Sequence, residues 1–164
     1  MHKIAIFMGS KSDEATVRPC CEVLDKLGLA YRFTVTSAHR TPERTERLVR
    51  ELEASGCEVF ICAAGMAAHL AGAVAARTIR PVIGIPVSSG NLGGLDALLS
   101  TVMMPAGFPV GTVALDKSGA RNAAWLAAQI LALKDAGLAE RITAERKKMG
   151  DDVEKSAAEL EAGN

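Results

Sequence analysis

The sequence predicts an α/β fold of three layers, in which helices cover both faces of a five-stranded parallel sheet. Short apolar segments alternate with longer segments of helical period, an order typical of parallel strands joined by right-handed crossovers. The inner short segments are almost continuously apolar, as expected for strands covered on both faces. A chain of 164 residues, 49% of them hydrophobic, can bury the core of one such domain.

Five short segments carry the strand pattern. Strands are predicted at Lys3–Met8, Ala30–Thr36, Val59–Ala64, Pro81–Val87 and Val110–Leu115. Parallel strands end at the same edge of a sheet, so the loops that follow them should meet there. This edge forms the crevice in which open α/β proteins bind their ligands.

The first helix is predicted from a stripe of apolar or small residues at helical spacing: Val17, Cys20, Cys21, Leu24 and Leu27. Pro19 lies within the stripe, and because an interior proline lacks the amide donor, we expect a kink or a later start. The second helix has Thr41 as its cap and Pro42 in its first turn, and it ends near Gly56.

Three further helices are predicted at Ala67–Thr78, Leu95–Met103 and Ala120–Leu133. A charged amphipathic segment follows Gly137, and we expect residues 137–162 to form a C-terminal helical extension. It either covers the domain or reaches a neighbouring subunit. The sequence contains no internal repeat or linker, so residues 1–164 are predicted to form a single domain.

The charge balance restricts the partners of the chain. Nineteen basic side chains oppose nineteen acidic ones, which leaves no electrostatic footprint for nucleic acid. The sequence contains no apolar run of the roughly eighteen residues that a membrane span needs. Met1, His2 and Lys3 lead directly into a strand rather than a signal peptide. We expect a soluble, cytoplasmic protein that binds neither membrane nor nucleic acid.

The four cysteines are predicted to be reduced core residues. Cys20, Cys21, Cys57 and Cys62 form no C-x-x-C pair and have no histidine nearby in the sequence, so the spacing does not indicate a metal site. Adjacent Cys20 and Cys21 point to different sides of a helix, which favours small core residues over redox partners.

Four unusual loops follow the first four strands and are expected to share one pocket. They are Gly9–Asp13, Ser37–Arg40, Gly65–His69 and Ser88–Gly94. The first combines a glycine, two hydroxyls and a helix start, which suits a phosphate group. Neither a P-loop pattern nor G-x-G-x-x-G occurs. Ser10 and Ser12 could equally do no more than cap the helix, and Asp13 could accept ribose hydroxyls or be an ordinary first-turn acid.

The second loop pairs His39 with Arg40. A guanidinium can hold a phosphate through two parallel hydrogen bonds, and an imidazole can transfer protons near neutral pH. We interpret His69 as a partly buried histidine that holds its loop in place. Gly65 allows close approach of the backbone to a ligand carboxylate or opens a helix. The Gly90–Gly94 segment is a flexible lid or a packing turn, and the sequence favours neither.

Together these loops resemble the N5-carboxyaminoimidazole ribonucleotide mutases, the PurE family of de novo purine synthesis. The resemblance rests on four segments in the order and spacing of that family: Met8–Asp13, Ser37–Pro42, Ala67–Leu70 and Met104–Val110. It covers roughly the first 135 residues. It implies a flavodoxin-like, Rossmann-like sandwich, a homo-octamer, and no metal or organic cofactor.

The resemblance also implies a reaction and roles for residues. The carboxylate of N5-carboxyaminoimidazole ribonucleotide would leave as carbon dioxide and then add to ring carbon C4. His39 would be the proton carrier for both steps. Ser10, Ser12, Ser37 and Arg40 would hold the phosphate, Asp13 the ribose, and Ala64 and Gly65 the migrating carboxylate. The implied substrate-binding set also includes Gly9, Ala38, Met66, His69 and Leu70. A histidine in a closed pocket can both give and take a proton, as this reaction needs.

Two branches of the family differ in their carboxyl donor. Arg40 and the Ala67–Leu70 segment resemble the mutases, whereas the branch that uses free carbon dioxide has a lysine in place of the arginine and lacks this histidine. Met66, Ala71 and Met103 stand where mutases commonly have glycine, proline and glutamine. An aminoimidazole ribonucleotide carboxylase using free carbon dioxide therefore remains the alternative.

Two more distant alternatives share the fold class. A flavodoxin-like nucleotide-binding protein or electron carrier needs aromatic rings around its flavin, but Trp125 falls in a helix and Tyr31 begins a strand. A phosphorelay receiver needs an acidic pair for magnesium, and the first strand ends in Phe7, Met8 and Gly9 instead.

Overall fold

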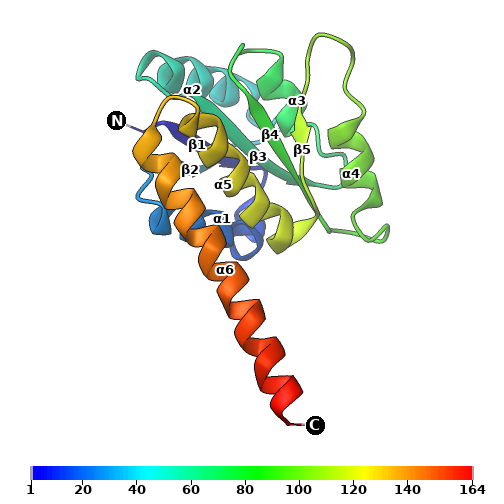
Figure 1. Cartoon of the computed structure of the whole chain (residues 1–164). Coiled ribbons are helices and arrows are strands. Elements are labelled where there is room, and N and C mark those ends of the chain that lie inside the picture. Colours follow the sequence, from blue (N-terminus) through cyan, green and yellow to red (C-terminus); the bar gives the residue numbers. More distant parts are fainter. Residues whose placement is uncertain (1, 164) are drawn as a thin grey trace. The chain divides into compact units, whose positions relative to one another are not determined.

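A parallel sheet of five strands forms the centre of the first of two compact units in the computed structural model (Figure 1). The structure describes residues 2–163 and divides into units Met1–Ala127 and Ala128–Asn164. The strands are β1 (Ile4–Met8), β2 (Tyr31–Val35), β3 (Val59–Gly65), β4 (Val82–Val87) and β5 (Gly111–Thr112). Their order is β2-β1-β3-β4-β5 and every pairing is parallel, which confirms the predicted sheet.

The strand order determines which face each helix covers. The chain steps from β1 to β2 in one direction and from β2 to β3 in the other. With right-handed crossovers, α1 (Glu14–Lys26) lies on one face, and α2 (Pro42–Ala54), α3 (Leu70–Ala75) and α4 (Leu95–Val102) lie on the opposite face. The direction reverses between β1 and β3, and α/β proteins bind ligands beside the carboxyl ends of the strands at such a point.

The core follows from strands that are covered on both sides. All five residues of β1 are buried. On the face that carries α2 and α3, Phe7 and Phe60 lie with their ring centroids 5.8 Å apart, in one cluster with Val49 and Val74. Burial of each such large side chain contributes roughly 1.5–3 kcal/mol. This core holds the strand ends, and hence the loops, in fixed positions.

One interpretation of Pro19 predicted a late start of helix α1, and this prediction was wrong. The helix runs from Glu14 to Lys26 through Pro19 and follows a 3-10 turn at Lys11–Asp13. The proline removes one backbone hydrogen bond of the helix. It is itself buried together with Val17 and Leu24, so burial of the apolar stripe outweighs the lost bond.

Three other predicted boundaries were wrong. Helix α3 begins at Leu70 rather than Ala67 and ends at Ala75, and the bend that precedes it contains Met66 with a φ of 55°. Strand β5 is confined to Gly111–Thr112, since this edge strand pairs only with β4. Helix α5 (Asp116–Ala132) starts before the predicted Ala120; there the Asp116 carboxylate accepts a hydrogen bond from the amide of Ser88 at 2.7 Å.

The second unit contains the end of α5 and the long helix α6 (Ala136–Ala162), which is the predicted C-terminal helix. Asp135 caps α6 by accepting a hydrogen bond from the amide of Leu138 at 2.9 Å. Leu138 and Ile142 are buried, whereas most of the rest of the helix is exposed. Among the helices described, none combines the length and apolar composition needed to cross a membrane.

All four cysteines are buried and form no disulfide, which confirms the prediction of core thiols. Burial raises the pKa of each thiol, that of Cys57 to about 11. Because only the thiolate is a strong nucleophile, these residues are suited to filling the core rather than to catalysis.

Candidate active site

A cavity of about 530 Å³ opens where the loops after β1, β2, β3 and β4 meet. The predicted site residues all line it: Gly9, Ser10, Ser12, Asp13, Ser37, Ala38, His39, Arg40, Ala64, Gly65, Met66, His69 and Leu70. Ala67 and Ser89 also line it, although the predicted set did not include them. The volume is in the usual range of small-ligand sites. Segments far apart in the sequence thus line one cavity.

The first loop is organised by its two serines. Ser10 has an extended backbone and occupies the N-cap position, where its hydroxyl accepts hydrogen bonds from the Ser12 amide at 3.3 Å and the Ser12 hydroxyl at 2.8 Å. The Ser12 hydroxyl also lies 3.3 Å from the Asp13 carboxylate, but its single proton can serve only one of these acceptors at a time. Ser10 therefore caps the 3-10 turn Lys11–Asp13 rather than α1, whose N-cap residue is Asp13, and both serines line the cavity.

Asp13 is half-buried beside these hydroxyls. Burial raises the pKa of its carboxyl above the ordinary value, although the hydrogen bonds from Ser12 and Ser10 and the charge of Arg40 oppose that rise. A carboxylate in this position can accept hydrogen bonds from ligand hydroxyls. It is not suited to contact a phosphate directly, since two anions repel each other.

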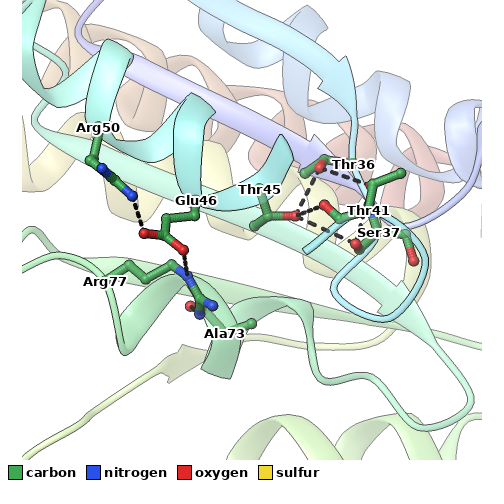
Figure 2. A network of polar contacts seen from close by, with 8 residues as sticks. All are labelled: Thr36, Ser37, Thr41, Thr45, Glu46, Arg50, Ala73 and Arg77. Atoms are coloured by element: carbon green, nitrogen blue, oxygen red, sulfur yellow. Dashed lines mark hydrogen bonds and ion pairs between the residues drawn. The ribbon is translucent and has the colours of Figure 1, made fainter. Parts of the chain in front are cut away.

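A buried threonine network positions the second loop (Figure 2). The hydroxyls of Thr36 and Thr45 lie 2.8 Å apart, and the Ser37 amide donates to the Thr41 hydroxyl at 3.0 Å. Thr41 occupies the predicted N-cap of α2, but its side chain makes no cap bond to the helix. Its hydroxyl binds the backbone of Ser37 instead. The network ties the loop that carries His39 to the first turns of α2.

Charged side chains link α2 to α3 beyond this network (Figure 2). Glu46 pairs with Arg50 of its own helix and with Arg77 at 3.7 Å, and Arg77 donates to the Ala73 carbonyl at 2.7 Å. Pairs this exposed each contribute about 0–1 kcal/mol. They connect α2 with α3 and with the turn that follows it.

Arg40 connects the first two loops across the cavity wall. Its guanidinium donates to the Gly9 carbonyl at 3.0 Å, and its amide donates to the Ser37 hydroxyl at 3.2 Å. A guanidinium has five N–H donors, so the bond to Gly9 fixes its position and leaves donors for a ligand. The fixed, positively charged guanidinium of Arg40 and the serines Ser10, Ser12 and Ser37 thus line the same cavity. This arrangement is suited to a phosphate.

The two histidines of the cavity contact each other. His39 Nε2 lies 2.8 Å from His69 Nδ1, with the rings nearly perpendicular at 88°. One ring donates the proton of this hydrogen bond and the other accepts it through its lone pair, and the tautomers of the two rings decide which is which. The interpretation of His69 as a partly buried residue was wrong: it is exposed at the N-cap of α3, because the turn after Met66 directs it to the cavity.

The third and fourth loops approach each other closely at Gly65. A Cβ atom on Gly65 would lie 1.9 Å from the Ser89 hydroxyl oxygen, so the packing of Ser89 requires a glycine here, and the predicted approach of a ligand carboxylate stays a prediction. Ser89 lies in the loop after β4, two residues beyond its end, and this position was the sequence signal for its place in the site. Gly94 has a φ of 88°, and a Cβ there would lie 2.4 Å from Leu115, which supports a packing turn at that end of Gly90–Gly94.

Met66 is the unusual residue of the third loop. Its φ of 55° lies in the left-handed region, which costs roughly 1–2 kcal/mol for a residue with a Cβ atom. Its side chain is 61% exposed and lines the cavity. Among the described residues, only Met66 and Asp116 combine a positive φ with a side chain.

The fold and the cavity define a flavodoxin-like α/β protein with a small-ligand site at its switch point. Residues 3–152 match the family described as AIR carboxylase, and the chain belongs to this family. It is 48% identical to the N5-carboxyaminoimidazole ribonucleotide mutase of Escherichia coli K12, over 92% of this chain and 89% of that protein. It is 50% identical to the mutase of Saccharolobus solfataricus, over 93% and 96%.

A solved structure agrees with the fold. The crystal structure of Treponema denticola PurE superimposes with a TM-score of 0.87 at 28% identity, and the match covers 96% of this chain and 97% of that one. The predicted family and the flavodoxin-like fold are therefore confirmed.

Proposed function

We propose that this chain is an N5-carboxyaminoimidazole ribonucleotide mutase of de novo purine synthesis, an isomerase that forms 4-carboxy-5-aminoimidazole ribonucleotide. Two relatives that carry this name match at 48% and 50% identity. The observation that carries the proposal is His39 on the same cavity wall as Arg40 and the serine hydroxyls. The cytoplasm is the proposed location, supported by four buried cysteines without disulfides.

In the proposed complex, the ligand spans the cavity from its polar wall to the histidines. The phosphate binds Arg40 and the hydroxyls of Ser10, Ser12 and Ser37, and the ribose hydroxyls donate to Asp13. These contacts place the imidazole ring beside His39. The carboxylate then lies near Ala64 and Gly65, at the carboxyl end of β3. Binding energy from the phosphate thereby orients the reacting atoms, which lowers the entropic cost of reaching the transition state.

The reaction needs one group that first gives and then takes a proton. His39 protonates N5 while the bond from N5 to the carboxyl carbon breaks, and the electron pair of that bond stays on nitrogen. Ring carbon C4 then attacks the released carbon dioxide, and His39 removes the C4 proton. The histidine ends as it began, and no atom is gained or lost overall. The contact with His69 holds the His39 ring in place for both transfers.

The carboxyl donor distinguishes the proposed mutase from a carboxylase that uses free carbon dioxide. We expect the purified chain to convert N5-carboxyaminoimidazole ribonucleotide in bicarbonate-free buffer, because Arg40 and His69 both line the cavity as the mutase branch requires. The measurement is the initial rate of product formation, compared with aminoimidazole ribonucleotide plus bicarbonate. Efficient turnover only with the second substrate pair would replace the mutase by the carboxylase.

We further propose a homo-octamer, and exposed apolar stripes support self-association. Leu95, Leu99 and Val102 lie on one side of α4 and are 55%, 50% and 46% exposed. Within the second unit, Met149 and Val153 of α6 are also exposed, at a spacing of four residues. Apolar surface of this kind marks protein interfaces in soluble proteins.

Light scattering tests the assembly. The particle mass should be about eight times the 17.2 kDa of one chain, and Leu99→Glu should reduce it, because a buried charge without a partner opposes association. Glu51→Gln, on exposed α2 surface, is the control. A stable and active monomer would contradict the octamer.

A further inference from the structure

We propose that Met66 closes the cavity over the carbon dioxide formed during the reaction, so that C4 recaptures it before it escapes. This retention role rests on the proposed mutase function. It assigns a purpose to a residue whose backbone is otherwise unfavourable, and it concerns the partition of the carbon dioxide intermediate between escape and recapture.

The first argument comes from the backbone of Met66. Glycine adopts a φ of 55° without steric cost, and asparagine tolerates it, whereas methionine has neither advantage. Strained backbone of this kind persists where surrounding structure imposes it, and it clusters at ligand sites. Core packing does not compensate for the strain here, because the side chain is 61% exposed. The position of the side chain at the cavity is therefore what the methionine contributes.

The second argument comes from the neighbours of the side chain. Met66 Cγ lies 3.9 Å from the position that a Cβ atom on Gly90 would occupy, and Ser89 of the same loop lies against Gly65. Met66 thus reaches from the loop after β3 to the loop after β4. Both loops contribute to the cavity lining, so the thioether side chain lies at the boundary between them.

The third argument concerns the chemistry of the wall that Met66 completes. Ala64, Ala67 and Leu70 give the side of the third loop an apolar part, next to the polar His69 and Ser89, whereas the first two loops supply hydroxyls and a guanidinium. Carbon dioxide is small and uncharged, and it needs no hydrogen-bond partner. Apolar side chains offer carbon dioxide no nucleophile that competes with C4. They also exclude water, which would otherwise hydrate the carbon dioxide. A flexible, unbranched methionine fits such an irregular boundary.

Carboxyl-labelled substrate tests the retention role directly. N5-carboxyaminoimidazole ribonucleotide carrying ¹³C in its carboxyl group is supplied in buffer equilibrated with unlabelled carbon dioxide. Two quantities are measured: the ratio of released aminoimidazole ribonucleotide to carboxylated product, corrected for decarboxylation without protein, and the label retained in the product. In Met66→Gly the ratio should rise roughly tenfold, equivalent to about 1.4 kcal/mol between escape and recapture, and label retention should fall.

Two further variants separate the side chain from the backbone. Met66→Leu keeps an apolar side chain and should retain the label as the original chain does. Met66→Asn tolerates the left-handed backbone but lacks apolar bulk, so it should leak as Met66→Gly does. The melting temperature of Met66→Gly should stay equal or rise, because relief of backbone strain offsets the added entropy of the unfolded chain.

The possible results lead to distinct conclusions. Label retention in Met66→Gly equal to that of the original chain would overturn the role of Met66, and so would equal leakage from Met66→Leu. If Met66→Gly fails to fold, the comparison of Met66→Leu with Met66→Asn decides in the same way. An original chain that forms no carboxylated product would instead refute the mutase function, and the retention role with it.

Discussion

Replacement of His39 by asparagine should lower turnover by at least about 10²–10⁴-fold, the usual contribution of general acid–base catalysis, while substrate binding survives. Asparagine keeps a polar side chain but cannot titrate. If His39 is the only group that exchanges protons with N5 and C4, both steps lose their proton carrier. Arg40, the serines and Asp13 remain in the cavity wall, so the phosphate and ribose are still held.

Turnover and equilibrium binding should be measured on the same His39→Asn preparation, after its fold and assembly are shown to be intact. His2→Asn is the matched control, because His2 is exposed and does not line the cavity; its turnover should be unchanged. Near-normal turnover in His39→Asn would reject His39 as the proton carrier and make His69, 2.8 Å away, the next candidate. Parallel loss of binding and turnover would show that His39 mainly shapes the pocket.

Replacement of Arg40 by alanine should weaken substrate binding by roughly 2–4 kcal/mol, because it removes a charge-assisted contact to the phosphate. The bond from Arg40 to the Gly9 carbonyl is lost as well, so the first loop loses its tie to the second. The dissociation constant, measured by calorimetry, should increase accordingly. Arg40→Lys keeps the charge without the planar fork of donors and should show an intermediate loss.

Arg47→Ala is the control for Arg40→Ala, since Arg47 is exposed on α2, pairs with Glu51 and does not line the cavity. Its binding should be unchanged. An unchanged dissociation constant in Arg40→Ala would place the phosphate elsewhere in the cavity. A general loss of stability in that variant would attribute the effect to the tie with Gly9, and the melting temperature separates the two.

Much of the fold was predictable because it depends on patterns that one segment carries by itself. Continuous apolar residues at Val59–Ala64 indicated a strand covered on both faces, and the stripe from Val17 to Leu27 indicated a helix despite Pro19. Element boundaries were less predictable where they depend on the backbone of the preceding loop. Helix α3 begins only at Leu70, after a bend in which Met66 has a positive φ, and no pattern of apolar residues reveals such an angle.

The sequence by itself determined which loops could form the site, because parallel strands end at one edge and carry their loops there. It placed Ser10, His39 and Arg40 in those loops. It did not determine the distances between them. Only the tertiary structure decided that His39 lies 2.8 Å from His69 and that Ser89 lies against Gly65. Contacts between loops depend on strand order, register and a few backbone angles acting together, and these arise only when the whole sheet has formed.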